Sequence, residues 1–170
     1  MTASARSLTP PEPLGPQHDL VRFSCGRPEL DAWLRDQALE SEGRSARTYV
    51  VCTGRSIVVG YYCIATGSVE RQGLPSKMRR ARGLPKQIPV AIIGRLARDE
   101  TFSGTGLGRD LLQDALRRIL AAAQIIGIRA VLVHALDEGA AAFWRSQDFI
   151  ESQIGSGTFF LPVETVAKAL

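Results

Sequence analysis

The stretch IPVAIIGRLARDETFSGTGLGRDLLQDALRRILAAAQII, residues 88–126, decides the fold of this chain. It begins with an apolar run typical of a buried strand, turns through Gly104, Gly106 and Gly108, and continues in a helical pattern. In such a turn backbone N–H groups converge, and the helix N-terminus adds partial positive charge. Glycine suits the turn because a side chain would block a phosphate and because some positions can require a positive φ. The stretch therefore predicts a site for a phosphate-bearing cofactor.

The details of the turn narrow the choice of cofactor. A P-loop places Lys-Ser or Lys-Thr after its last glycine, whereas here Arg109-Asp110 follows Gly108, which argues against nucleotide hydrolysis. A dinucleotide fold needs G-x-G-x-x-G early in the chain and an acidic residue about twenty positions on. This turn is G-x-G-x-G and lies late in the chain. Where the acidic residue would be expected, the sequence has Ile125-Ile126. A glycine-rich surface turn without a ligand stays as the plain alternative.

Periodicity along the chain predicts an α/β fold with a mixed sheet. Pro28 is typical of the first position of a helix, and the apolar spacing after it continues that helix. Further helices are expected at 107–120, 138–147 and from 163. Strands are expected at 47–53, 56–64 (with or without a continuation to 69), 89–97, 130–135, 149–154 and 158–161, and a loop with or without a short helix at 73–87. Residues 1–17, rich in proline and serine, are expected to be an irregular tail before a single domain at 18–170.

Composition bounds the remaining possibilities. A chain of 170 residues is one domain that buries roughly two-thirds of its unfolded surface. No apolar run reaches the ~18 residues of a membrane span, and the N-terminus lacks the apolar region of a secretory signal. Three cysteines without a C-x-x-C pair predict reduced thiols in a cytoplasmic protein. With only His18 and His134, far apart in the sequence, no metal site is expected.

The net charge of +4 conceals an uneven distribution. Residues 71–98 contain eight basic residues and no acidic one, which leaves 13 basic and 17 acidic residues in the rest of the chain. The segment interleaves arginine and lysine with proline and glycine and has no aromatic residue, which favours phosphate contact over base stacking. A solvated charged loop without a partner is the alternative.

The run IIGRLARDETFSGTGLGRDLLQDAL resembles the pyrophosphate-binding motif of the GNAT superfamily of N-acetyltransferases. The wider order of blocks, FSCGRPELDAWL, RTYVVCTGRSIVVGYY, IPVAIIGRLARDE, RAVLVHALDEGAAAFWRSQDF and TFFLP, resembles the acetyltransferase toxins of bacterial toxin–antitoxin modules (TacT-type) over residues 20–162. The resemblance implies a GNAT fold, a central mixed sheet flanked by helices. It also implies acetyl-CoA as cofactor, acetylation of the amine of aminoacyl-tRNA, a homodimer, and a ribbon-helix-helix antitoxin as partner.

The resemblance also assigns residues. Backbone groups of the strand before the loop hold the pantetheine arm, and the loop and the first helical turn surround the pyrophosphate. The residues expected to bind the cofactor are Leu96, Ala97, Arg98, Ser103, Gly104, Thr105, Gly106, Leu107, Gly108, Arg109 and Phe143. Ser103 stands where the family motif begins with Gln or Arg. Because the cradle consists mainly of backbone amides, we expect this difference to cost only modest affinity.

The chemistry has one unusual position. A free α-amino group has a pKa of about 7.7–8.0, so part of it is neutral near pH 7 and a dedicated base is optional. A backbone amide of the strand, at Ala97, can polarise the thioester carbonyl. The toxin family has a Phe-Tyr pair whose tyrosine serves as general acid, whereas this chain has Phe143-Trp144, and Asp148 replaces the glycine before Phe149. Losing a positioned acid costs ~10²–10⁴ in rate, so weakened activity is expected. The plain alternative for Trp144 is an aromatic residue that packs the last helix onto the sheet.

Other side chains are weaker candidates. Tyr61 and Tyr62 are possible substitute acids, but adjacent strand positions face opposite sides, so at most one is expected to point inward. His134 is a possible base at a strand end, although a structural histidine is the simpler interpretation. The residues expected to bind tRNA phosphates are Lys77, Arg79, Arg80, Arg82, Lys86 and Arg95.

The sequence therefore predicts a toxin-type acetyltransferase that modifies aminoacyl-tRNA. Two alternatives stay open. One is a GNAT enzyme that acetylates a small amine or a protein N-terminus. The other is a catalytically weakened fold that binds CoA or RNA and pairs with an antitoxin.

Overall fold

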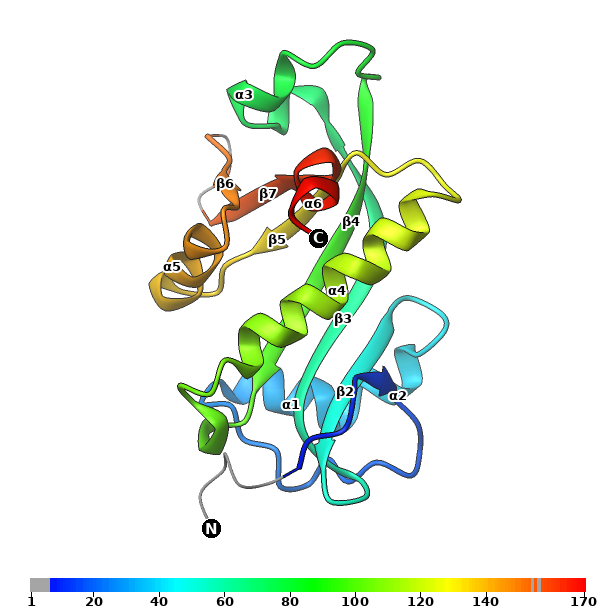
Figure 1. Ribbon diagram of the computed structural model, residues 1–170, viewed down its shortest axis with the longest axis vertical. Helices are drawn as coiled ribbons and strands as arrows, with labels where there is room; N and C mark the ends of the chain where they lie inside the picture. The colour runs from blue at the N-terminus through cyan, green and yellow to red at the C-terminus, as the bar shows by residue number, and fades with distance from the viewer. Residues whose placement is uncertain (1–6, 154, 156) are drawn as a thin grey trace. The chain divides into compact units, whose positions relative to one another are not determined.

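The computed structural model describes residues 7–153, 155 and 157–170 (Figure 1). Its strands form one seven-stranded sheet in the order β1-β2-β3-β4-β5-β7-β6. Strands β4 and β5 are parallel, whereas the pairs β1/β2, β2/β3, β5/β7 and β6/β7 are antiparallel. The sheet confirms the predicted α/β class with mixed strand directions.

The elements have the following bounds. The strands are β1 (Glu12–Pro13), β2 (Arg47–Thr53), β3 (Ile57–Glu70), β4 (Gln87–Arg98), β5 (Ala130–His134), β6 (Ile150–Glu151) and β7 (Thr158–Pro162). The α-helices are α1 (Pro28–Asp36), α2 (Ala38–Ser41), α3 (Ser76–Arg79), α4 (Leu107–Ala123), α5 (Glu138–Ser146) and α6 (Val163–Ala169). Two 3-10 turns are η2 (Arg71–Gly73) and η3 (Glu100–Phe102).

The chain divides into two compact units. The first comprises Met1–Ala65 and Gly94–Ala115, and the second comprises Thr66–Ile93 and Leu116–Leu170. Strands β3 and β4 and helix α4 are each divided between the units. The units are therefore not successive segments of sequence.

The first unit is built on the faces of β2 and β3. Pro28 begins α1, which buries Leu30, Trp33 and Leu34 because these apolar residues recur at helical spacing. Their side chains join a core with residues of β2 and β3, among them Tyr61. On the other side of β3, Gly60 faces α4: a Cβ at Gly60 would lie 3.1 Å from Leu111 Cδ1 and 3.3 Å from Leu107 Cδ2. Glycine at position 60 thus permits close packing of the helix.

The second unit buries β5 almost entirely. Ala130, Val131, Leu132 and Val133 are each at most 4% exposed, as expected for a strand covered on both faces. Its core contains the cluster of Leu74, Ile88, Val90, Ala130, Leu132 and Phe160. Apolar residues of the basic segment, Met78 and Leu84, pack against the same cluster. The segment between β3 and β4 is thereby fixed by its apolar residues.

Most of the expected elements are confirmed, with two corrections. The strand expected at 149–154 is wrong in extent, because β6 ends at Glu151, and Ile154 lies outside the described residues. Part of the tail expected to be irregular is also ordered: Glu12 and Pro13 form β1 opposite Val50 and Tyr49, while residues 1–6 lie outside the description. Strand β1 is at the edge of the sheet, where a proline is tolerated because no neighbour needs its missing N–H.

Across the described part of the chain, no helix combines the length and the apolar character that crossing a membrane requires. All three cysteines are buried and free of disulfide bonds.

Candidate active site

The glycine turn has the left-handed backbone that its sequence predicts. Gly104 has φ 75° and Gly106 has φ 86°, a conformation that side chains with a Cβ rarely adopt. A Cβ built at either position would meet nothing within 4 Å. The space ahead of both glycines is therefore open, and it fits a group that approaches the backbone closely.

Helix α4 begins directly after this turn. Its first intrahelical bond runs from the Asp110 N–H to the Gly106 oxygen at 3.0 Å, so the N–H groups of Leu107, Gly108 and Arg109 precede the regular ladder. Seventeen residues of aligned peptide dipoles add partial positive charge at this end. The turn and the helix end can therefore bind an anion such as a diphosphate.

Asp99 supports the turn and is not among the site residues predicted from the sequence. It is 8% exposed. Its Oδ1 accepts from the Thr101 N–H (3.0 Å) and hydroxyl (2.8 Å), and its Oδ2 accepts from the Ser24 N–H (3.0 Å). Asp99 caps η3 and ties the end of β4 to the N-terminal part of the first unit. The Asp-x-Thr spacing is a local capping signal that could have indicated it.

The strand residues expected to hold the pantetheine arm lie at the end of β4. Ala97 is 6% exposed and belongs to the core of the first unit. The pairing of β4 with β5 covers Val90–Ile92, so Leu96–Arg98 lie further along β4 than this paired segment. Arg98 donates to the Ser103 hydroxyl at 3.3 Å, which joins the strand to the first residue of the turn. The turn thus gains a guanidinium at its edge.

Arg95 differs from the other expected tRNA contacts. Its guanidinium lies over the Trp33 ring, 4.2 Å from the ring centroid, within the first unit. Burial raises the pKa of the neighbouring Cys63 thiol, and the charge of Arg95 opposes this shift. Arg95 is half-buried by these contacts, whereas a mobile surface cation would be fully exposed. Its assignment to tRNA stays a prediction.

The expectation that at most one of Tyr61 and Tyr62 points into the protein is wrong. Both are 0% exposed, because both faces of β3 are covered in the first unit. Tyr61 donates to the Leu30 oxygen at 2.8 Å and packs against Phe23 and Trp33, and burial raises the pKa of its hydroxyl above the ordinary value. Tyr62 donates to Asp114 of α4. Neither hydroxyl has the exposure expected of a proton donor for a leaving thiolate.

Trp144 lies in α5, in the second unit, and is 6% exposed. Its ring contacts Phe143 (centroids 5.1 Å apart, 68° between planes) and Phe149 (5.1 Å, 58°). Two aromatic contacts of this geometry support a packing role.

Helix α5 ends in a left-handed turn at Asp148, whose φ is 69°. The Asp148 N–H donates to the Arg145 oxygen and the Phe149 N–H to the Trp144 oxygen, each at 3.1 Å, the bonding pattern of a Schellman motif. Arg145 is exposed and forms ion pairs with Glu138 (2.7 Å) and Glu151 (3.0 Å). His134 is exposed and shares a hydrogen bond with the Thr158 hydroxyl at 3.1 Å.

The basic segment in the second unit presents its cations to solvent. Residues 71–86 form η2, α3 and loop, as predicted, and the rest of the segment belongs to β4 (Figure 1). The exposed cations are Arg71, Lys77, Arg79, Arg80, Arg82 and Lys86. The backbone beneath them is held by a bond from the Ser152 hydroxyl to the Gly73 oxygen (2.8 Å) and by one from the Arg71 N–H to the Lys86 oxygen (3.0 Å). The segment is a fixed, positively charged surface suited to phosphate groups.

Comparison with known proteins shows the family. No protein-family model matches the chain. It is, however, 43% identical over 141 residues to a tRNA-acetylating toxin of Mycobacterium tuberculosis, a match that covers 82% of each protein. The chain belongs to the GNAT-type tRNA-acetylating toxins of toxin–antitoxin modules. A second relative of this toxin, described as a probable toxin TacT of Sinorhizobium fredii, is 37% identical over 128 residues, 74% of this chain and 71% of the relative.

Solved structures agree with this membership. A structure of AtaT complexed with acetyl-methionyl-tRNAfMet matches the toxin with a TM-score of 0.88 and 31% identity, covering 96% of this chain and 99% of that one. A structure of AtaTR bound with acetyl-CoA matches with a TM-score of 0.83 and 31% identity, covering 95% and 97%. A structure of an AtaT mutant bound to the C-terminus of the antitoxin AtaR matches with a TM-score of 0.82 and 29% identity, covering 96% and 98%.

Proposed function

We propose that this toxin transfers the acetyl group of acetyl-CoA to the amino group of an aminoacyl-tRNA and thereby blocks translation. The glycine turn is the observation that carries the proposal: two left-handed glycines leave open space in front of the N-terminus of a 17-residue helix. A diphosphate fits that space, and acetyl-CoA supplies both a diphosphate and a thioester. The relatives support the acceptor, since one is named a tRNA-acetylating toxin and another is complexed with acetyl-methionyl-tRNAfMet.

The residues of the first unit take distinct roles in this proposal. Backbone N–H groups from Gly104 to Arg109 bind the diphosphate oxygens, except that of Thr105, which donates to the Phe102 oxygen at 3.3 Å. Backbone groups of Leu96–Arg98 bind the pantetheine arm, and the Ala97 N–H polarises the thioester carbonyl as negative charge develops on its oxygen. The α-amino acceptor has a pKa of about 7.7–8.0, so a neutral fraction attacks without a dedicated base.

Incubation of the toxin with labelled acetyl-CoA and total charged tRNA tests the proposal. The expected product is an N-acetylated aminoacyl ester that alkaline hydrolysis releases from the tRNA. Labelling of free amino acids or of protein N-termini, with no label on charged tRNA, would favour an acetyltransferase for a small amine or a protein instead.

The exposed cations of the basic segment bind the tRNA backbone in this proposal. Reversing the charge of Arg79 and Arg80 together to glutamate removes two phosphate contacts and adds repulsion, so KM for charged tRNA rises while the affinity for CoA is unchanged. The slope of log affinity for tRNA against log salt concentration becomes shallower by about 0.7–0.9 for each lost phosphate contact. The pair Arg44→Glu and Arg55→Glu is a matched control, because both arginines are exposed and lie in the first unit. Equal effects of the two pairs would contradict the assignment.

The second candidate function rests on Trp144. Because indole gives up no proton at useful pH and this ring is packed between Phe143 and Phe149, the toxin has reduced activity in this proposal. In the extreme case the fold only binds CoA or RNA. A toxin that binds CoA but leaves charged tRNA unlabelled would establish this second function.

The proposed assembly is a homodimer that pairs with a ribbon-helix-helix antitoxin. A structure of a relative with the C-terminus of its antitoxin supports the pairing. Light scattering measures the mass of the purified toxin alone, which tests the homodimer, and its mass with the candidate antitoxin, which tests the complex.

A further inference from the structure

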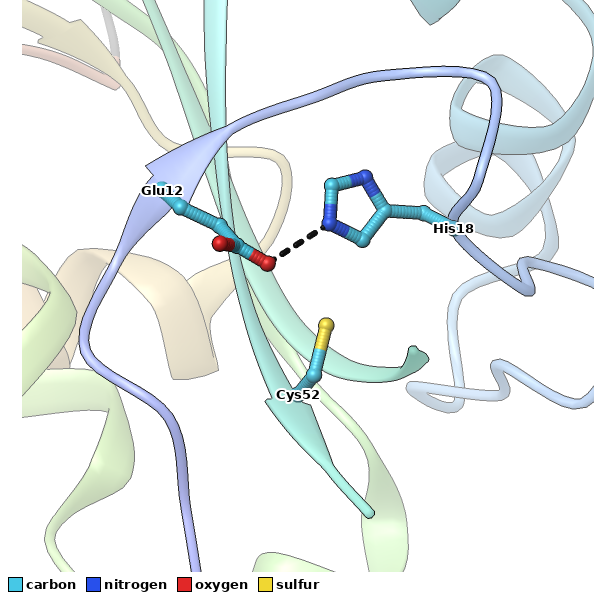
Figure 2. Close-up of side chains that lie close together, drawn as sticks. All are labelled: Glu12, His18 and Cys52. Atoms are coloured by element: carbon cyan, nitrogen blue, oxygen red, sulfur yellow. Dashed lines mark hydrogen bonds and ion pairs between the residues drawn. The ribbon is translucent and has the colours of Figure 1, made fainter. Parts of the chain in front are cut away.

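A cluster of three potential metal ligands lies in the first unit, outside the proposed active site (Figure 2). It consists of Glu12 on β1, His18 in the turn that follows, and Cys52 on β2. One carboxylate oxygen, one imidazole nitrogen and the sulfur all lie within 4.8 Å of one another. Figure 2 shows the sulfur pointing toward the Glu12–His18 pair. No metal site is expected from the sequence, because the cysteines form no C-x-x-C pair and the two histidines lie far apart along the chain.

The backbone holds these three residues in place. Glu12 of β1 pairs with Val50 of β2, and Cys52 lies two residues after Val50 on β2. The Cys52 N–H donates to the Thr9 hydroxyl (2.9 Å), and the Thr9 N–H donates to the Cys52 oxygen (2.8 Å). These contacts make the cluster a part of the fold and not a chance meeting of surface side chains.

The histidine is oriented as metal-binding histidines are. Nε2 of His18 lies 2.8 Å from Glu12 Oε1, while Nδ1 lies 3.0 Å from the Gly15 nitrogen and 3.2 Å from the Gly15 oxygen. When Nε2 carries the proton it donates to Glu12, and Nδ1 accepts from the Gly15 N–H. When Nε2 binds a cation instead, Nδ1 carries the proton and the Gly15 oxygen accepts it, which is the usual outer partner of a ligating histidine.

A nucleophilic role for this cysteine is a poorer explanation. Cysteine hydrolases place the histidine between the thiol and the carboxylate, with one ring nitrogen facing each. In this cluster Nε2 of His18 is hydrogen-bonded to Glu12 and Nδ1 to the Gly15 backbone, so neither ring nitrogen is reserved for the thiol. Burial raises the pKa of the Cys52 thiol to about 11, and the charge of Glu12 adds to the shift, so the thiol is not activated. Cys52 is also 0% exposed, so the sulfur is not presented to a substrate in solvent.

We propose that Glu12, His18 and Cys52 bind a divalent transition-metal ion of the zinc class, with water in the fourth position. Zinc prefers sulfur, imidazole nitrogen and carboxylate oxygen at about 2.0–2.3 Å, so its ligand atoms lie roughly 3.3–3.8 Å apart. The cluster reaches this geometry through small side-chain shifts, since the Glu12 side chain is 46% exposed and can move. The thiol loses its proton to solvent as the sulfur–metal bond forms, and the carboxylate binds already ionised, so about one proton is released per ion near neutral pH.

The bound ion stabilises the attachment of the N-terminal segment to β2. Two of its ligands come from residues 12–18 and one from β2, so the ion closes a link that otherwise depends on a few edge-strand hydrogen bonds. The metal therefore binds the folded chain in preference to the unfolded chain and raises the unfolding temperature.

Titration of the metal-free full-length toxin with Co²⁺ tests the site. The expected result is one ion per chain, a sulfur-to-cobalt charge-transfer band, d–d bands of four-coordinate intensity, and release of about one proton. Cys52→Ala abolishes the charge-transfer band. Cys63→Ala keeps it, and this is a matched control because Cys63 is also a buried thiol on a neighbouring strand of the same unit.

A second variant separates loss of a ligand from loss of folding. Glu12→Gln keeps a hydrogen-bond partner for His18 at a half-exposed position, so it folds, and it weakens Co²⁺ binding at least about tenfold. Zinc raises the melting temperature of the unaltered toxin and of Cys63→Ala, but not that of Glu12→Gln or Cys52→Ala. Absence of a charge-transfer band in the folded toxin, or equal binding by Cys52→Ala and Cys63→Ala, would overturn the proposal.

Discussion

Two turns of this toxin use the same left-handed backbone for opposite purposes. The turn before α4 has positive φ at Gly104 and Gly106, and the turn after α5 has it at Asp148. Before α4 the N–H groups of Leu107–Arg109 precede the helical ladder, and the space beside the glycines is open. After α5 the N–H groups of Asp148 and Phe149 both bond to helix carbonyls. The first turn has hydrogen-bonding capacity left for a ligand, and the second has used its capacity to end a helix.

The side chains around the two turns strengthen this contrast. At the first turn Arg98 donates to the Ser103 hydroxyl at the edge, and the Thr105 hydroxyl donates to the Phe102 oxygen at 2.6 Å. At the second, Arg145 binds Glu138 on one side and Glu151 on the other, and the rings of Trp144 and Phe149 pack beneath. A left-handed turn is therefore a candidate binding site only where it keeps unused donors.

The largest expected effect is on the acetylation rate, and it comes from a substitution in α5, the helix before the second turn. Replacing Trp144 with tyrosine supplies the hydroxyl that the family pattern places there, and a positioned acid contributes ~10²–10⁴ in rate. We expect kcat for aminoacyl-tRNA acetylation to rise above that of the unaltered toxin and to exceed that of Trp144→Phe by about 10²-fold. The phenylalanine variant is the control, because it loses similar volume without gaining a hydroxyl. Equal rates for the two variants would show that residue 144 only packs the second unit.

The next effect concerns the first turn. Gly106→Ala introduces a Cβ at φ 86°, which costs about 1–2 kcal/mol of stability, and places a methyl group where we propose that the diphosphate binds. We expect the affinity for CoA, measured by calorimetry, to fall at least about tenfold, which is 1.4 kcal/mol.

Gly54→Ala is the matched control for this variant. Gly54 has φ 64° in the β2–β3 connection, and a Cβ there also meets nothing within 4 Å. It suffers similar backbone strain, but CoA affinity is expected to stay unchanged. If both variants lose affinity equally, the loss reflects strain in the fold and the first turn is not a cradle.

The comparison also shows which features the sequence could predict. The glycine turn and α4 follow from local signals, since alternating glycines stand directly before a helical pattern. The position of Trp144 next to Phe149 is local too, because a helix end brings residues five apart together. The exposure of Arg79 and Arg80 follows from their charge.

Features that depend on distant partners could not be predicted. Both faces of β3 are covered by elements that lie far away in the sequence. Tyr61 bonds to Leu30, 31 residues away, and Tyr62 bonds to Asp114, 52 residues away. Proline near Glu12 suggested an irregular tail, but at a sheet edge the missing N–H costs little. The left-handed φ of Asp148 could not be predicted either, because the residue at this position is not glycine.

A smaller effect sharpens the account of the second turn. Asp148 holds a φ of 69° that glycine adopts without strain, so Asp148→Gly should raise the free energy of unfolding by about 0.5–1 kcal/mol. Asp148→Ala should lower it, because alanine has the Cβ without a short polar side chain that bonds locally. Urea denaturation measures both variants. A glycine variant no more stable than the unaltered toxin would mean that the aspartate side chain contributes stabilising contacts of its own.

The smallest effect tests the ion pair that closes the second turn. Hydrogen bonds from Arg145 and from the Gly157 N–H hold the pKa of Glu151 below its ordinary value. A carboxyl with a lowered folded-state pKa stabilises the fold above its unfolded pKa of about 4.3, and this contribution is lost as pH falls through the lower folded value. Glu151→Gln should therefore melt slightly below the unaltered toxin at pH 7, and the two melting temperatures should converge in acid. Both groups are exposed, so salt should shrink the difference at pH 7 as well. A difference that persists in acid and in high salt would mean that Glu151 supports the turn through packing or neutral hydrogen bonds and not through its charge.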